Sequence, residues 1–159
     1  LVMKRPLSDF GFDLGDFRWG SKWLITIPLL VVPLIYLSSK MPDVRTEYPL
    51  AKSLLTDSSR LLVYELGYVV FYYIAWEFFF RGFLLFGLKE RFGAVNAILI
   101  QTISSCLVHI DKPEGEIIGS IFIGILFGMI ALRSRSIWWV FLSHISIGVL
   151  TDLFIIYFY

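Results

Sequence analysis

Five apolar stretches separated by short polar segments make up most of this chain. They lie at about residues 23–38, 61–88, 92–110, 117–132 and 137–159. A helix needs about 20 residues, within a range of about 17–25, to cross the hydrocarbon core of a bilayer, so the first and fourth stretches need their flanking residues and the second is long enough to tilt. Isolated strands cannot cross, because their backbone groups would remain unpaired in hydrocarbon. The pattern predicts an all-α fold, a polytopic membrane helical bundle of about five transmembrane helices.

The polar segments predict the domain organisation. Residues 1–22 form a polar N-terminal segment of mixed charge, and residues 23–159 are predicted to form a single transmembrane helical domain. The longest linker, residues 39–60, contains two prolines, whereas "KERFG" at 89–93 and "RSRS" at 133–136 are short, basic turns.

The lysines and arginines between the apolar stretches predict the orientation, because cytoplasmic loops carry an excess of them. If the N-terminus is cytoplasmic, eight lie on the inner side and five on the outer side. The inner residues are Lys4, Arg5, Arg18, Lys22, Lys89, Arg91, Arg133 and Arg135, and the outer residues are Lys40, Arg45, Lys52, Arg60 and Lys112. We therefore expect an integral membrane protein with a cytoplasmic N-terminus.

Composition supports a membrane environment and excludes some partners. Hydrophobic residues make up 57% of the 159 residues and charged residues only 17%, whereas soluble domains are about 45–50% apolar and about a quarter charged. A chain of this length cannot bury so much apolar surface inside itself, so membrane lipid is the expected partner. The net charge is +1, and no basic stretch has interleaved aromatic residues, which argues against a nucleic-acid partner.

Small residues recur every fourth position in one apolar stretch, at Ser120, Gly124 and Gly128. Residues at this spacing share one face of a helix, and small side chains let two helices approach closely in lipid. We predict that this face packs against another helix.

Glu77 and Arg81 interrupt a long apolar stretch in the sequence "WEFFFRG". Each ionisable residue costs at least about 2.5–3.5 kcal/mol at the centre of a membrane helix, and the i, i+4 spacing places these two on one helix face. The pair either serves only to neutralise itself or belongs to a functional site. Two leucines would be less costly than a self-neutralising pair.

The two histidines of the chain, His109 and His144, lie in different apolar stretches. Each can be a hydrogen-bonded core residue. Together with Glu77 they can also bind a divalent metal such as Zn²⁺, or activate water by general-base chemistry. A bis-histidine haem site needs both at one depth, yet a count of about 1.5 Å per residue places His109 toward the outer side and His144 toward the inner side.

Three further polar residues are secondary candidates. Asp152 lies two turns after His144, where it either orients the surroundings of that histidine or lies near the membrane surface. Glu116 follows His109 in a loop and either folds back toward it or stays in solvent. Cys106 precedes His109 by three residues and forms either a Cys–His nucleophile pair or a small buried core residue.

Around these residues the chain resembles the CPBP family, which comprises CAAX prenyl proteases and bacteriocin-processing membrane proteins (Abi family). That family carries a Glu-Glu-x-x-x-Arg motif on one helix, a Phe-x-x-x-His motif on a later helix and a His-x-x-x-Asn/Asp motif on a third. Here "WEFFFRG" supplies Glu77 and Arg81 of the first motif, His109 matches the second motif and His144 matches the third. The resemblance extends over about residues 60–159.

The resemblance implies a hydrolase, an intramembrane metalloendopeptidase or endopeptidase of a prokaryotic plasma membrane. It would cleave membrane-associated peptides or proteins with water activated by glutamate and histidine. Three positions depart from the motifs: Trp76 replaces the first glutamate, Ser105 the phenylalanine and Gly148 the Asn/Asp. An active enzyme would need Glu77 or Glu116 as its base. The departures favour an alternative, a catalytically impaired family member acting as a membrane binding or bacteriocin-immunity protein.

Overall fold

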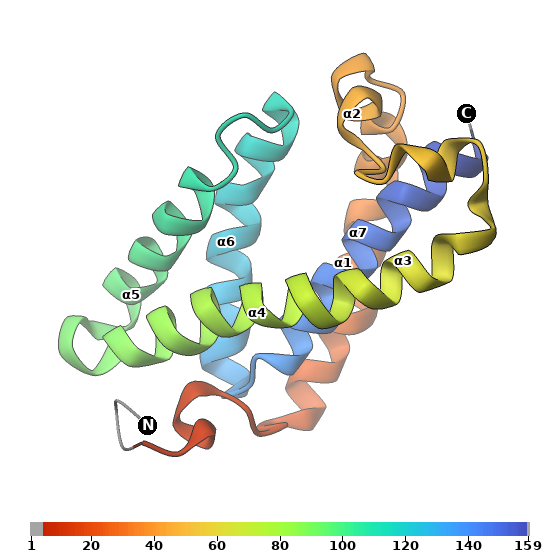
Figure 1. Cartoon of the computed structure of the whole chain (residues 1–159). Helices are drawn as coiled ribbons and strands as arrows, with labels where there is room; N and C mark the ends of the chain where they lie inside the picture. Colours follow the sequence, from red (N-terminus) through yellow and green to blue (C-terminus); the bar gives the residue numbers. More distant parts are fainter. Residues whose placement is uncertain (1–4, 159) are drawn as a thin grey trace.

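The computed structural model describes residues 5–158, and every regular element among them is a helix (Figure 1). The α-helices are α1 (Phe17–Ser38), α2 (Pro42–Glu47), α3 (Leu61–Tyr68), α4 (Ile74–Glu77), α5 (Gly87–Leu107), α6 (Glu114–Ser134) and α7 (Trp138–Tyr157). The π-helical stretches are η4 (Val69–Tyr73) and η5 (Phe78–Phe86), and the short 3-10 helices are η1 (Leu7–Phe10), η2 (Lys52–Leu55) and η3 (Ser58–Arg60). The all-α prediction is confirmed.

Within residues 5–158, four continuous helical stretches are long and apolar enough to cross a membrane. They are Phe17–Ser38, Ser58–Leu107, Glu114–Ser134 and Trp138–Tyr157. The second has 50 residues and breaks inside α5 at Gly93, whose φ of 80° and ψ of 164° are not helical and suit glycine best. Figure 1 shows the chain doubling back there. This stretch therefore supplies two of the predicted crossings, and the polytopic helical bundle is confirmed.

The first membrane helix begins earlier than the hydropathy pattern predicts, at Phe17 instead of residue 23. The Asp16 carboxylate caps it by accepting a hydrogen bond from the Trp19 backbone N–H at 3.0 Å, as good N-terminal caps do. Its first turns then pack on α7: a Cβ on Gly20 would lie 2.3 Å from the Trp139 indole. Tertiary contact thus extends the helix into a polar part of the sequence.

Ion pairs hold the start of the chain and two short turns together at one end of the bundle. Arg5 pairs with Glu90 at 2.8 Å, and Arg133 pairs with Asp16 at 3.2 Å. The linker that contains α2 lies at the opposite end (Figure 1). The turns at 89–93 and 133–136 therefore share an end, as the predicted topology requires, while the orientation relative to the cytoplasm stays a prediction.

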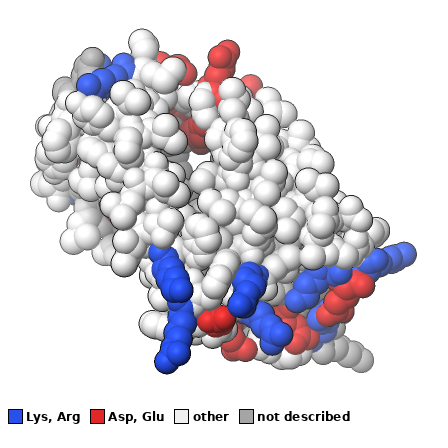
Figure 2. All heavy atoms as spheres, turned by 180° about the vertical axis from the view of Figure 1, so that it is seen from behind, with Lys and Arg blue, Asp and Glu red and all other residues white. Residues whose placement is uncertain are grey.

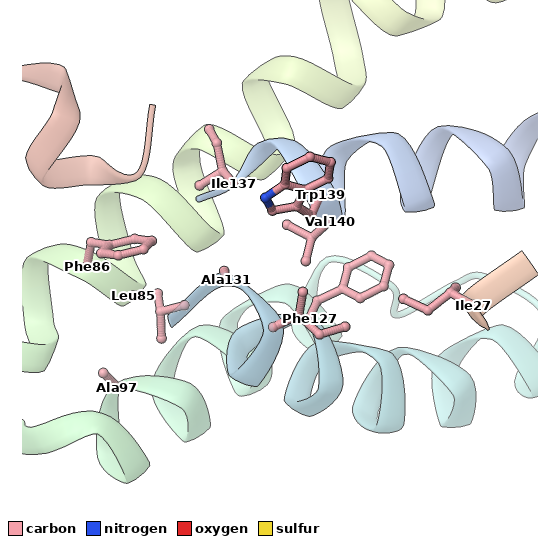
Figure 3. Packing of buried hydrophobic residues seen from close by; sticks show 10 residues of the cluster. Ile27, Leu85, Phe86, Ala97, Phe127, Ala131, Ile137, Trp139 and Val140 are labelled. Carbon is pink, nitrogen blue, oxygen red and sulfur yellow. The ribbon is translucent and has the colours of Figure 1, made fainter. Parts of the chain in front are cut away.

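The apolar core lies where η5, α6 and α7 meet (Figure 3). Leu85 of η5, Phe127 and Ala131 of α6, and Val140 of α7 are all completely buried in one cluster. Their burial fixes the three helices against each other and provides the wall behind the polar residues described below.

Large apolar side chains cover much of the outer surface instead of filling the interior. Leu29 of α1, Val63 of α3 and Phe71 of η4 are 69–83% exposed, whereas Glu77 and Gln101 are completely buried. Figure 2 shows charged side chains gathered toward the two ends of one face, with a wide band of other residues between them. Lipid-facing apolar groups and inward-facing polar groups are the arrangement expected in a bilayer.

The predicted packing face of small residues meets α5. The hydroxyl of Ser120 donates to the Cys106 sulfur at 3.1 Å. The side-chain amide of Gln101 donates to the Gly124 carbonyl at 2.8 Å, and a Cβ on Gly124 would lie 2.9 Å from the Thr102 side chain. Close approach of two helices along small residues is therefore confirmed.

Candidate functional site

A cavity of about 610 Å³ lies between α1, the α3–α4 stretch, the α5–α6 turn and α7, and the linker with α2 covers one side of it. Apolar and tyrosine side chains form most of its wall. Its polar lining includes both histidines and three acids: His109, His144, Glu65, Glu116 and Asp152. Most of the predicted candidates thus surround one cavity, whereas Glu77, Arg81 and Cys106 are not part of its lining.

Glu77 lies behind His144, where it joins two basic groups. Its Oε1 accepts a hydrogen bond from Arg81 Nη1 at 3.1 Å and another from His144 Nδ1 at 2.7 Å. Glu77 and Arg81 are almost completely buried, and the guanidinium lies 5.4 Å from the centre of the Phe127 ring. Arg81 belongs to a π-helical stretch, a geometry that recurs at functional sites. The carboxylate therefore orients His144 instead of entering the cavity.

Each histidine donates its Nδ1 proton to a fixed acceptor. His144 donates to Glu77, and His109 donates to the Ser105 carbonyl oxygen at 2.7 Å. A carbonyl oxygen only accepts hydrogen bonds, so the neutral His109 ring carries its proton on Nδ1 and a lone pair on Nε2. The His109 Nε2 lies 3.8 Å from Glu116 Oε1. Both rings thus leave Nε2 for chemistry in the cavity.

Trp76 packs edge-to-face against both imidazoles, with ring centroids 5.4 Å from His109 and 6.3 Å from His144. The two histidines therefore contact the same indole, while their depths relative to the membrane stay a prediction.

The linker between α1 and α3 contributes Tyr48, a residue that the sequence did not indicate. Its hydroxyl lies 2.9 and 2.8 Å from the two carboxylate oxygens of Glu116 and donates to them. Burial, followed by the negative charge of Glu116, raises the pKa of Tyr48, so the phenol keeps its proton. Lys112 also pairs with Glu47 of the same linker. Glu116 therefore does fold back toward His109 and is held there.

Asp152 is buried and meets a second acid, Glu65 of α3. The two carboxyl groups lie within hydrogen-bonding reach of one another, and Oε1 of Glu65 has no hydrogen-bond partner among the described residues. A hydrogen bond between two carboxyl groups needs one proton between them. Asp152 thus meets an acid of another helix, and its depth relative to the membrane surface stays a prediction. Its contact joins α3 to α7 at the far end of the cavity.

The predicted metal centre of Glu77, His109 and His144 is not assembled. In the described part of the chain, no three His, Cys, Asp or Glu side chains lie so that they could hold a metal ion. The reason is local: Glu77 is engaged by Arg81 and His144, while His109 faces Glu116. Cys106 receives a hydrogen bond from Ser120 of α6, which favours its interpretation as a packing residue.

Comparison with known proteins identifies one family. The family model described as type II CAAX prenyl endopeptidase Rce1-like matches residues 58–150, more than half of the chain. The matched region contains Glu77, Arg81, His109 and His144. The comparisons with curated proteins and with solved structures gave no match.

Proposed function

The chain belongs to the Rce1-like family of type II CAAX prenyl endopeptidases, and from this premise we propose that it is an intramembrane endopeptidase. Its substrates would be membrane-associated peptides or lipid-linked protein tails, which can reach a cavity whose wall is largely apolar. The four apolar helices and the family indicate an integral membrane protein. We propose the plasma membrane of a prokaryote with the N-terminus in the cytoplasm, which reporter fusions to the N-terminus would test.

The observation that supports this proposal best is the pairing of His109 with Glu116 at the cavity. The 3.8 Å between Nε2 and Oε1 is too long for a direct hydrogen bond but suits one shared water molecule. Such a water would donate one hydrogen to the Nε2 lone pair and one to the carboxylate. Its oxygen lone pair then remains for attack on a carbonyl carbon.

The reaction would follow general-base hydrolysis. Glu116 takes a proton as the water oxygen bonds to the scissile carbonyl carbon, and it returns the proton to the leaving amine as the C–N bond breaks. His144, in its protonated form, donates from Nε2 to the carbonyl oxygen while negative charge develops there. The Glu77 carboxylate, 2.7 Å from Nδ1, stabilises that imidazolium and fixes its orientation, as the acid of a catalytic triad does.

The test is cleavage of a fluorescence-quenched peptide that ends in a prenylated CAAX sequence, with the purified protein in liposomes. His109→Ala and Glu116→Gln should each lower the rate by about 10²–10⁴-fold, the usual contribution of a general base. Glu114→Gln is the matched control, because Glu114 lies in the same helical turn as Glu116 but is exposed. Full cleavage by Glu116→Gln would remove it from the mechanism.

A metal chelator distinguishes this mechanism from a metalloprotease. Because the described side chains do not form a three-ligand set, we expect cleavage to continue in its presence. Loss of cleavage that added Zn²⁺ restores would instead support a metal-dependent reaction.

A second candidate function is that of a membrane binding or bacteriocin-immunity protein without catalysis. It is favoured by Trp76, which lies against both imidazoles at the position where the family motif has its first glutamate. In that case the wild type should protect cells from a bacteriocin, and folded His109→Ala and Glu116→Gln variants should protect equally well. Protection that disappears together with cleavage would argue for the enzyme.

A further inference from the structure

Tyr73 is a buried tyrosine beside His144 that the mechanism above does not use. It ends the π-helical stretch η4, lines the cavity, and its ring packs edge-to-face on the His144 imidazole with centroids 5.0 Å apart. No hydrogen bond joins its hydroxyl to another residue in the described part of the chain. The hydroxyl is not one of the fully enclosed polar atoms that lack a partner, so it is open to the cavity and available to a ligand or water there.

Gly148 is the reason that the hydroxyl reaches α7. A Cβ built on Gly148 would lie 1.7 Å from the Tyr73 hydroxyl oxygen and 2.9 Å from the ring carbon that bears it. The hydroxyl therefore occupies the place that any side chain at residue 148 would take. Residues 144 and 148 are one helical turn apart on the same face, so the hydroxyl and the His144 ring lie side by side on the cavity wall.

We propose that the Tyr73 hydroxyl is a second hydrogen-bond donor to the carbonyl oxygen of the scissile peptide, next to His144. This inference rests on the proposed endopeptidase function and deepens it. As water attacks the carbonyl carbon, the C=O π electrons move onto oxygen, and the Tyr73 O–H donates to that oxyanion without giving up its proton. When the tetrahedral intermediate collapses, the C=O bond forms again and the C–N bond breaks.

The test compares Tyr73→Phe with wild type in the prenylated CAAX peptide assay. The change removes one oxygen and keeps the ring against His144. Loss of one preorganised oxyanion donor lowers kcat by about 10²–10³-fold, and we expect KM to change little because the bond strengthens only in the transition state. Tyr36→Phe is the control, since Tyr36 of α1 is 40% exposed and is not part of the cavity lining.

The outcomes separate this inference from the proposed function. Cleavage by wild type with an unchanged kcat in Tyr73→Phe overturns the role of Tyr73 alone, as does a loss of kcat that merely follows a loss of thermal stability. Absence of cleavage by wild type overturns both. Should Tyr73→Phe not fold, 3-fluorotyrosine at position 73 keeps ring and hydroxyl but makes a stronger donor. A raised kcat would then support the role, and an unchanged kcat would overturn it.

Discussion

Glutamine at position 77 should destabilise the bundle strongly, although it keeps the shape of the side chain. Glu77 is completely buried, Arg81 is 3% exposed, and the ion pair between them spans 3.1 Å. Removing one partner of a buried pair leaves the other charge uncompensated and costs about 3–5 kcal/mol. In a membrane protein the dissociated helices stay in lipid, where polar groups also find partners, so we expect the lower end of that range. The cavity shape and the apolar core would be unchanged.

The matched variants are Arg81→Met and the double change Glu77→Gln with Arg81→Met. Arg81→Met leaves the Glu77 carboxylate with His144 as its only hydrogen-bond partner among residues 5–158, so it should also lose stability. The double variant removes both charges at nearly constant volume, and replacing a whole buried pair by neutral groups is often close to neutral. It should therefore be more stable than either single variant, and much more stable than the sum of the two losses predicts.

Unfolding in mixed detergent micelles, followed by tryptophan fluorescence, measures these free energies. The same samples separate structure from chemistry. The folded double variant still offers a carbonyl oxygen to His144 Nδ1 but lacks the carboxylate that stabilises the imidazolium, so cleavage should stay low when stability returns. If the unfolding free energy of Glu77→Gln lay within about 0.5 kcal/mol of wild type, the range of ordinary surface substitutions, the Glu77 charge would not be what stabilises Arg81. A double variant that is no more stable than the single variants would lead to the same conclusion.

Two further predictions concern packing and the acid pair. Gly124→Leu should lower detergent stability by at least about 1–3 kcal/mol through overpacking, because a Cβ there already lies 2.9 Å from Thr102. Gly119→Leu on the same helix is the control, because no heavy atom lies within 4 Å of a Cβ built there. Equal losses of thermal stability in the two variants would refute the argument. Asp152→Asn should nearly keep wild-type stability, since its amide can donate to Glu65. Asp152→Leu leaves the Glu65 carboxyl unpaired and should lower the free energy of unfolding by about 1–3 kcal/mol. Indistinguishable melting temperatures for the two variants would show that the contact contributes nothing.

Hydropathy predicts the membrane helices because burial in lipid selects apolar residues along the whole length of a helix. It also predicts the α5–α6 contact, since small residues at four-residue spacing leave a groove for a neighbouring helix. The start of α1 at Phe17 could not be predicted in this way. It depends on the Asp16 cap and on packing of Gly20 against Trp139, and neither interaction changes the local hydropathy. Boundaries set by tertiary contact are therefore the part of the fold that the pattern misses.

In the candidate site, too, the sequence indicates some residues and misses others for a physical reason. Charged groups in a membrane interior are so costly that their mere presence marks them, and the spacing of Glu77 and Arg81 correctly places them in contact. Neutral partners have no such cost, so the sequence does not single them out. The Ser105 carbonyl that orients His109, and the hydroxyl of Tyr48 that holds Glu116, come from a backbone group and a distant linker.

Neutral groups also determine which contacts the ionisable residues can make. Once Trp76 contacts both imidazoles, Glu77 is separated from the cavity and a different acid meets His109. In lipid, therefore, the ionisable residues of a sequence locate a site, whereas the neutral residues around them determine which acid faces which histidine. The chemistry of the site follows from that second set.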